Sequence, residues 1–307
     1  MNAASLAAKA SATPGLIRIV ATGPAAPLQP AAPAVPAPSR PAPALRERWG
    51  KRLLPVVKST VPPVFGIVLL LGVWSMVAAK GSIPGPLQTW NAAALLFADP
   101  FYSNGPNDQG IGWNVLSSLK RVAVGFGFAA LVGIPAGFII GRFAFMNSMV
   151  SPIISLLRPV SPLAWLPIGL MVFKQADPAA TWTIFICSIW PMIINTAVGV
   201  QRVPQDYMNV ARVLDLSEWK IVTRILFPSV LPYMLTGIRL SIGTAWLVIV
   251  AAEMLTGGVG IGFWVWDEWN NLKVEHIIIA IFVIGIVGLT LEQMLILIAR
   301  RFSYGSA

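Results

Sequence analysis

The sequence has very few of the side chains that catalysis and redox chemistry use. Its 307 residues include one cysteine, Cys187, and one histidine, His276, and only 11% of the residues are charged. A single cysteine cannot form a disulfide within the chain. The sequence has no cluster of His, Cys, Asp and Glu that would indicate a metal site, and no nucleophile with a matching base. These absences argue against an enzyme.

The sequence also has no phosphate-binding loop of the form Gly-x-x-x-x-Gly-Lys-Ser/Thr. Gly50-Lys51 is followed by Arg52, and Lys58-Ser59 lacks the preceding glycine. We therefore expect this chain to bind no nucleotide and to hold no cofactor of its own.

Hydrophobic residues, in contrast, make up 56% of the sequence and gather in long runs. Crossing a hydrocarbon core of about 30 Å takes roughly 20 apolar residues in a helix, and helices satisfy every backbone polar group within lipid. The pattern predicts an all-α integral membrane protein with about six transmembrane helices. We expect these spans near residues 61–79, 122–141, 149–174, 181–200, 231–253 and 277–299. Prolines must break or kink the third span at Pro152, Pro159, Pro162 and Pro167.

The composition divides the chain into three parts. Residues 1–58 are expected to form a disordered, Ala/Pro-rich cytosolic tail that ends in a basic cluster beside the membrane. Residues 59–302 are expected to form the transmembrane domain, and residues 303–307 a short cytosolic C-terminus.

The net charge of +10 follows the ends of the apolar runs, which favours a topology signal over a nucleic-acid surface. With the N-terminus in the cytosol, twelve basic residues fall on cytosolic flanks and five on the outside. The cytosolic set is Arg46, Arg48, Lys51, Arg52, Lys58, Arg142, Arg202, Arg212, Lys220, Arg224, Arg300 and Arg301. The external set is Lys80, Lys120, Arg121, Lys174 and Lys273. Both termini are therefore expected in the cytosol.

A polar segment, residues 203–228, lies between two apolar spans on the predicted cytosolic side, and we call it the elbow. Pro204 can open a short helix, in which Tyr207, Val210, Ala211 and Leu214 form one apolar stripe. Ser217 can cap a second helix that ends before Pro228. The segment is either a docking element for a soluble partner or an ordinary interfacial loop.

The elbow resembles the "EAA" loop of ABC importer permeases, whose pattern is Glu-Ala-Ala, three residues, Gly, nine residues, Ile, one residue, Leu-Pro. The residues that match in register are Ala211, Ile225 and Pro228. The departures are Asn209 for Glu, Val210 for Ala, Asp215 for Gly and Phe227 for Leu. The change to Asp215 is tolerable because Asp is one of the few non-glycine residues that enter the left-handed region.

Other segments resemble the nitrate/sulfonate/taurine branch of this family over residues 60–302. These are Ser118–Val122 with Gly125-Phe126, Leu157–Gly169 and Thr236–Leu240. Ala251–Phe263, followed by Trp266-Asp267, is similar to nitrate permease subunits.

This resemblance implies a type I (MetI-like) permease fold with cytosolic coupling helices, in a multi-pass protein of a bacterial inner membrane. It implies a permease homodimer, a cytosolic ABC ATPase that binds ATP and Mg²⁺, and an external binding protein, periplasmic or lipid-anchored, that delivers a small anion. The elbow would dock on the ATPase through Tyr207, Asn209, Val210, Ala211, Leu214, Asp215, Ile225 and Pro228. Nitrate is the expected substrate. Nitrite, cyanate, bicarbonate, taurine and alkanesulfonates are alternatives, and an ion-coupled secondary transporter is a further one.

Two groups of residues inside the spans have more than one interpretation. Small residues recur every fourth position at Gly125, Ala129, Gly133, Gly137 and Gly141, which favours close helix packing over pore lining. Charges inside spans are costly, so Arg158, Arg239 and Glu253 either line the translocation path or pair with neighbours. Lys120 and Arg121, at the predicted external mouth, either attract an anion, seat the binding protein or act as interfacial anchors, and the last role is favoured.

Overall fold

The computed structural model describes the backbone of residues 45–81 and 83–302, and the side chains of residues 61–81 and 83–301. Most of the predicted N-terminal tail, residues 1–44, and the predicted C-terminus, residues 303–307, lie outside the described residues. The elements α2 to α11 all belong to the unit formed by residues 62–307.

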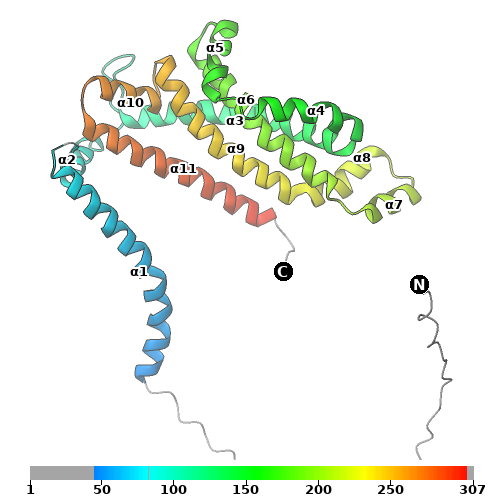
Figure 1. Ribbon diagram of the computed structural model, residues 1–307, viewed down its shortest axis with the longest axis horizontal. Coiled ribbons are helices and arrows are strands. Elements are labelled where there is room, and N and C mark those ends of the chain that lie inside the picture. The colour runs from blue at the N-terminus through cyan, green and yellow to red at the C-terminus, as the bar shows by residue number, and fades with distance from the viewer. Residues whose placement is uncertain (1–44, 82, 303–307) are drawn as a thin grey trace, which may run out of the picture. The chain divides into compact units, whose positions relative to one another are not determined.

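The regular secondary structure of the described residues is helical, apart from one isolated antiparallel bridge between Ser103 and Gln109. The helices are α1 (Leu45–Ala78), α2 (Pro86–Leu96), α3 (Ile111–Arg142), α4 (Ala144–Leu157), α5 (Pro162–Phe173), α6 (Ala176–Gln201), α7 (Gln205–Val213), α8 (Glu218–Ile221), the π-helix η1 (Val222–Leu226), α9 (Phe227–Thr256), α10 (Ile261–Asn270) and α11 (Val274–Phe302) (Figure 1).

Helix α1 begins earlier than the sequence analysis expects. The predicted disorder extends to residue 58, whereas residues 45–58 are helical. The repeated Pro-Ala pairs end at Pro43, and the following Leu45-Arg46-Glu47-Arg48 is made of good helix formers. The basic cluster therefore lies on the first turns of α1.

By length and composition, five helical segments can each cross a membrane. They are Val61–Ala78, Ile111–Arg142, Ala176–Gln201, Glu218–Thr256 and Val274–Arg301. Helices α4 and α5 pass the same test only as a pair, and they are bent by 99° at their junction. The prediction of about six spans is thus confirmed if this pair counts as one broken span.

The break between α4 and α5 lies where the sequence places its prolines. Arg158 ends α4 as its C-cap, and Ser161 precedes Pro162 at the start of α5. Since Pro159 and Pro162 cannot donate backbone hydrogen bonds, the helix cannot continue through this point. The third predicted span is therefore two short helices.

Helix α6 lies at the centre of the fold, between α3 and α9 (Figure 1). In its most apolar window 61% of the residues are buried, compared with 11% in α11 and none in Val61–Ala78. Its buried side includes Ile184, Met192 and Thr196. Helices α3, α6 and α9 thus form the packed body, while α11 and the second half of α1 expose most of their apolar side chains.

The small residues of α3 lie against α6. A Cβ atom added to Gly137 would lie 2.6 Å from the Thr196 Cβ and 2.8 Å from the Ile193 carbonyl oxygen. Equivalent additions to Gly125 and Gly141 would also meet α6 within 3 Å. Gly127, on another face of α3, has nothing within 4 Å. The backbones of α3 and α6 therefore approach too closely for a larger side chain along this face.

Candidate functional site

The elbow is made of α7, α8 and η1, which together lead from α6 into α9. Pro204 is the N-cap of α7 and not its first residue. At the other end, the Leu216 N–H donates to the Ala211 carbonyl oxygen at 3.0 Å, and the Asp215 N–H donates to that of Arg212 at 3.1 Å. This pair of hydrogen bonds is a Schellman motif.

The Schellman motif requires a left-handed residue at Asp215, and Asp215 has a φ of 44°. Glycine fits this position with least strain, and aspartate is among the side chains that tolerate it. The structure confirms the expected backbone conformation at this departure from the family pattern.

The inner side of the elbow packs on the ends of α6 and α9. Ala211 is fully buried, and it belongs to a cluster with Val203, Ile221, Leu226 and Val230. A larger or charged side chain at Ala211 would have no room in this cluster. The elbow is thus held firmly on the body by its inner side.

The outer side of the elbow exposes large apolar side chains. The exposed fractions are 54% for Tyr207, 56% for Val210, 85% for Val213, 63% for Leu214 and 75% for Trp219. The predicted stripe is therefore split, since Ala211 faces inward and the other three members are exposed. An apolar patch beside charged residues in a polar segment is typical of a protein–protein contact.

The second elbow helix differs from the prediction. It does not end before Pro228, since α8, η1 and α9 continue from Glu218 to Thr256 without a break. The Phe227 N–H donates to the Val222 carbonyl oxygen, which is a π-helical hydrogen bond. This π turn and the position of Pro228 in the first turn of α9 let the chain pass a residue that lacks an N–H. Motion of the elbow can therefore pass directly into α9.

The three charged candidates inside the spans do not form one site. Arg239 on α9 places its Nε 2.8 Å from Oε1 of Glu292 on α11. Arg158 lies at the break between α4 and α5, and Glu253 is 14 residues beyond Arg239 on α9, or about 21 Å along the helix axis. Their shared role in a translocation path stays a prediction.

Glu253 is 1% exposed and accepts hydrogen bonds from three donors. The Ser118 hydroxyl lies 2.7 Å from Oε2, a guanidinium nitrogen of Arg121 lies 2.6 Å from Oε1, and the Gly262 N–H lies 3.0 Å from Oε2. Arg121 also pairs with Asp177 of α6. Because Arg121 is engaged inside the protein, its predicted role as an interfacial anchor is wrong.

The glycines before α10 allow the chain to wrap around this carboxylate. A Cβ on Gly260 would lie 2.5 Å from Oε2 of Glu253, and a Cβ on Gly262 would lie 2.1 Å from the Val250 carbonyl oxygen. The N–H groups of Gly260 and Ile261 donate to the side chains of Asn114 and Ser118 at 2.9 Å each. Three of the first backbone donors of α10 are thus satisfied by side chains of α3 and α9.

The sequence predicts only that Glu253 lines the translocation path or pairs with a neighbour, and it does not predict this network. Ser118 and Glu253 are 135 positions apart in the chain, so no local pattern joins them. The available signal was the run of glycines directly after a buried acid. Helix α10 carries Trp264, Trp266 and Trp269.

No group of three or more His, Cys, Asp and Glu side chains suited to a metal occurs among the described residues. His276 lies in the first turn of α11 and stacks on Trp264. Its Nδ1 is 3.0 Å from Oε2 of Glu268. These groups hold α10 beside α11.

The family model "binding-protein-dependent transport system inner membrane component" matches residues 133–304. The nitrate import permease protein NrtB of Synechocystis sp. is 48% identical over 255 residues, which cover 82% of this chain and 93% of that protein. The bicarbonate transport system permease protein CmpB of the same organism is 44% identical over 254 residues, covering 81% and 89%.

Solved transporters share the fold at low sequence identity. An inward-facing structure of the MetNI methionine ABC transporter aligns with a TM-score of 0.54 and 15% identity, over 62% of this chain and 94% of that chain. An amino acid ABC transporter structure aligns with a TM-score of 0.53 and 16% identity, over 70% and 97%.

The fold and the sequence matches define the class: the protein is a multi-pass permease of an ABC importer. More particularly, it belongs to the family of inner membrane components of binding-protein-dependent transport systems. As such it is a permease subunit and not itself an ATPase, and a transport system of this kind includes an ATPase and a binding protein.

Proposed function

We propose that this chain forms the translocation pathway of an ATP-driven importer for nitrate, as a homodimer with both termini in the cytosol. A periplasmic or lipid-anchored protein delivers the anion from outside. A cytosolic ATPase binds ATP and Mg²⁺ and moves the elbow. Because α8, η1 and α9 are continuous, movement of the elbow reorients α9 and with it the pathway.

The observation that carries the coupling role is the two-sided construction of the elbow. Its inner side is fixed to the body through fully buried Ala211, while its outer side exposes Val210, Val213, Leu214 and Trp219. A docking element that transmits force needs both a rigid base and an adherent surface. An interfacial loop that only touches lipid would not need the tightly packed base.

The substrate proposal rests on similarity and on one segment. Two NrtB proteins are 48% and 46% identical to this chain, and Ala251–Phe263 resembles the corresponding part of nitrate permeases. Bicarbonate is the second candidate, because CmpB proteins reach 44% and 43% identity. Both substrates are small, planar oxyanions with one negative charge, so a pathway that passes one is chemically suited to the other.

Labelled uptake separates these candidates. A strain that lacks this gene, with and without a plasmid copy, is given ¹³N-nitrate or ¹⁴C-bicarbonate at low external concentration. The proposal expects that the plasmid restores nitrate uptake and leaves bicarbonate uptake unchanged. Restoration of bicarbonate uptake alone would assign the chain to bicarbonate.

The coupling role is tested by two substitutions on the elbow. Leu214→Asp places a charge on the exposed side and should leave folding intact, while uptake and co-purification of the ATPase are lost. Ala211→Asp buries a charge without a partner and should lower the amount of folded protein itself. Normal uptake by Leu214→Asp protein would contradict docking through this surface.

A further inference from the structure

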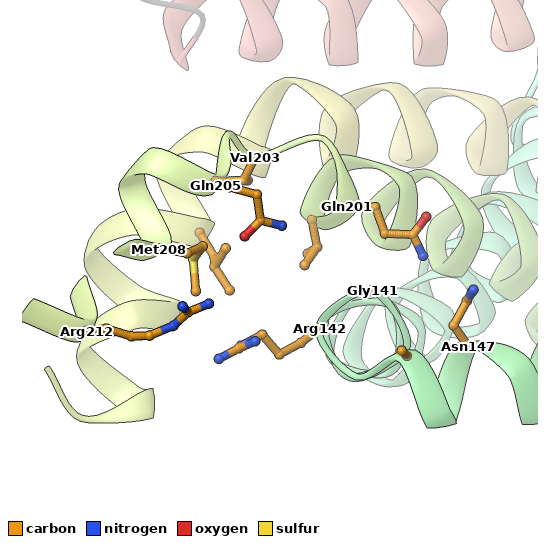
Figure 2. Close-up of a pocket in the computed structure, with 11 residues that line it drawn as sticks. Gly141, Arg142, Asn147, Gln201, Val203, Gln205, Met208 and Arg212 are labelled. Carbon is orange, nitrogen blue, oxygen red and sulfur yellow. The ribbon is translucent and has the colours of Figure 1, made fainter. Parts of the chain in front are cut away.

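A polar cavity of about 340 Å³ lies at the base of the elbow. Its walls come from the end of α3, the start of α4, the end of α6 and from α7 (Figure 2). Its volume is within the range of about 300–1,000 Å³ that is usual for small-molecule sites. None of the candidate coupling residues lines it.

Two arginines from opposite walls point into this space (Figure 2). Arg142 ends α3, and Arg212 lies on α7. Glu218 on α8 pairs with Arg142 at 2.9 Å, and its side chain is 62% exposed. Within the part of the chain whose side chains are described, no carboxylate lies within ion-pairing distance of Arg212. The cavity therefore has a net positive charge.

The remaining polar groups of the cavity are neutral amides. Asn147, Gln201 and Gln205 contribute side chains that can donate hydrogen bonds. Guanidinium groups bind planar and tetrahedral oxyanions through paired N–H donors, and added amide donors satisfy the oxygens that are left. A cation would be repelled here, and an apolar ligand would leave these donors unsatisfied.

We propose that this cavity binds one small inorganic oxyanion between Arg142 and Arg212. The bound anion bridges α7 to the junction of α3 and α4, beside the ion pair that joins Arg142 of α3 to Glu218 of α8. The proposed function requires the elbow to move during transport, and the following consequence rests on it. An oxyanion that accumulates in the cytosol and binds here restrains that movement and slows import.

The cavity offers a local probe for this binding. Met208 lies in its wall and is half-buried, and the native Cys187 is buried in α6. The full-length Met208→Cys variant in lipid nanodiscs, alone and assembled with its ATPase, is labelled with a maleimide at constant ionic strength. Labelling rates are measured against increasing sodium nitrate or sodium phosphate, with sodium chloride as the reference.

We expect at least one of the two oxyanions to slow labelling in a saturable way, alone and in the assembly, while chloride does not. Adding Arg212→Gln should raise the oxyanion concentration that slows labelling by half roughly tenfold or more. The change removes one charged hydrogen-bonding group, whose contribution to binding is of that size. Adding Arg224→Gln, which makes the same charge change on the elbow but outside the cavity, should leave it unchanged.

Three results would overturn the proposal. Labelling could be insensitive to both oxyanions, or equally sensitive in Arg212→Gln and Arg224→Gln proteins. Alternatively, the assembled ATPase could itself protect the cysteine and remove the effect of the anions, which would assign the cavity to a carboxylate of that partner. None of these results depends on which anion is transported, so uptake measurements test the proposed function separately.

Discussion

Replacing Glu253 with alanine should destabilise the protein and release the start of α10. The change removes a residue that is 1% exposed, and with it one acceptor of Ser118 and Arg121 and the side-chain acceptor of the Gly262 N–H. Loss of one member of a buried ion pair costs about 3–5 kcal/mol, because the other charge stays buried. Arg121 keeps Asp177 and the Val259 carbonyl oxygen, so the lower end, about 3 kcal/mol, is expected here.

Two further substitutions calibrate this value. Glu253→Gln keeps the side-chain volume and one acceptor oxygen, but its amide NH₂ replaces the second acceptor and faces the surrounding N–H and O–H donors. This change should lower stability by about 1–3 kcal/mol. Glu218→Gln removes the exposed partner of Arg142, whose pairing is worth less than about 1 kcal/mol. The expected order of stability is therefore Glu218→Gln above Glu253→Gln above Glu253→Ala.

Thermal unfolding in nanodiscs, followed by the fluorescence of the 12 tryptophans, measures this order. A loss of about 3 kcal/mol should lower Tm by roughly 6 °C or more in a chain of this size. Hydrogen exchange gives a local readout, since the amides of Gly260, Ile261 and Gly262 should lose protection before the rest of α10. If Glu253→Ala protein unfolds at the temperature of the wild type, or keeps protection at these amides, the network does not hold α10 in place.

The remaining predictions concern packing and turn geometry. Gly137→Ala should weaken packing of α3 on α6 by about 1–3 kcal/mol because its Cβ meets Thr196, whereas Gly127→Ala should be neutral, and the two unfolding temperatures check this. Asp215→Gly should keep uptake and match or exceed wild-type stability. The β-branched Asp215→Val should lose about 1–2 kcal/mol of stability, because residue 215 has a φ of 44°. Equal stability of the two variants would contradict backbone strain at this position. Trp246→Phe removes the hydrogen bond from Nε1 to the Ile284 carbonyl oxygen at 2.9 Å and should lower stability by about 1 kcal/mol, measured by the same unfolding assay.

The parts of the fold that the sequence predicts are those with local causes. A run of apolar residues long enough to cross a membrane determines a helix by itself, so the long spans are found. The prolines at 159 and 162 locate the break in the third span for the same reason. The left-handed turn at Asp215 follows from one residue position in a recognisable spacing.

The parts that sequence analysis misses depend on residues distant in the chain or on an uncommon hydrogen-bond pattern. Pro228 normally marks the end of a helix, and only the π turn at Val222–Leu226 lets the elbow continue into α9. The pairing of Arg121 with Glu253 joins α3 to α9 through the tertiary fold. Which face of α7 points inward also could not be predicted, because Ala211 and Val210 are neighbours in the sequence and both are apolar.

The most direct test of the account is to find which subunit touches the outer side of the elbow. Leu214→Cys and Leu272→Cys carry a short photo-crosslinker in otherwise native protein, since Cys187 is buried and both leucines are exposed. In the assembled transporter, the probe at Leu214 is predicted to crosslink the cytosolic ATPase, and the probe at Leu272, in the turn between α10 and α11, is not. Crosslinking of the ATPase from Leu272, or labelling of Leu214→Cys by an impermeant reagent added outside intact cells, would contradict the proposed coupling.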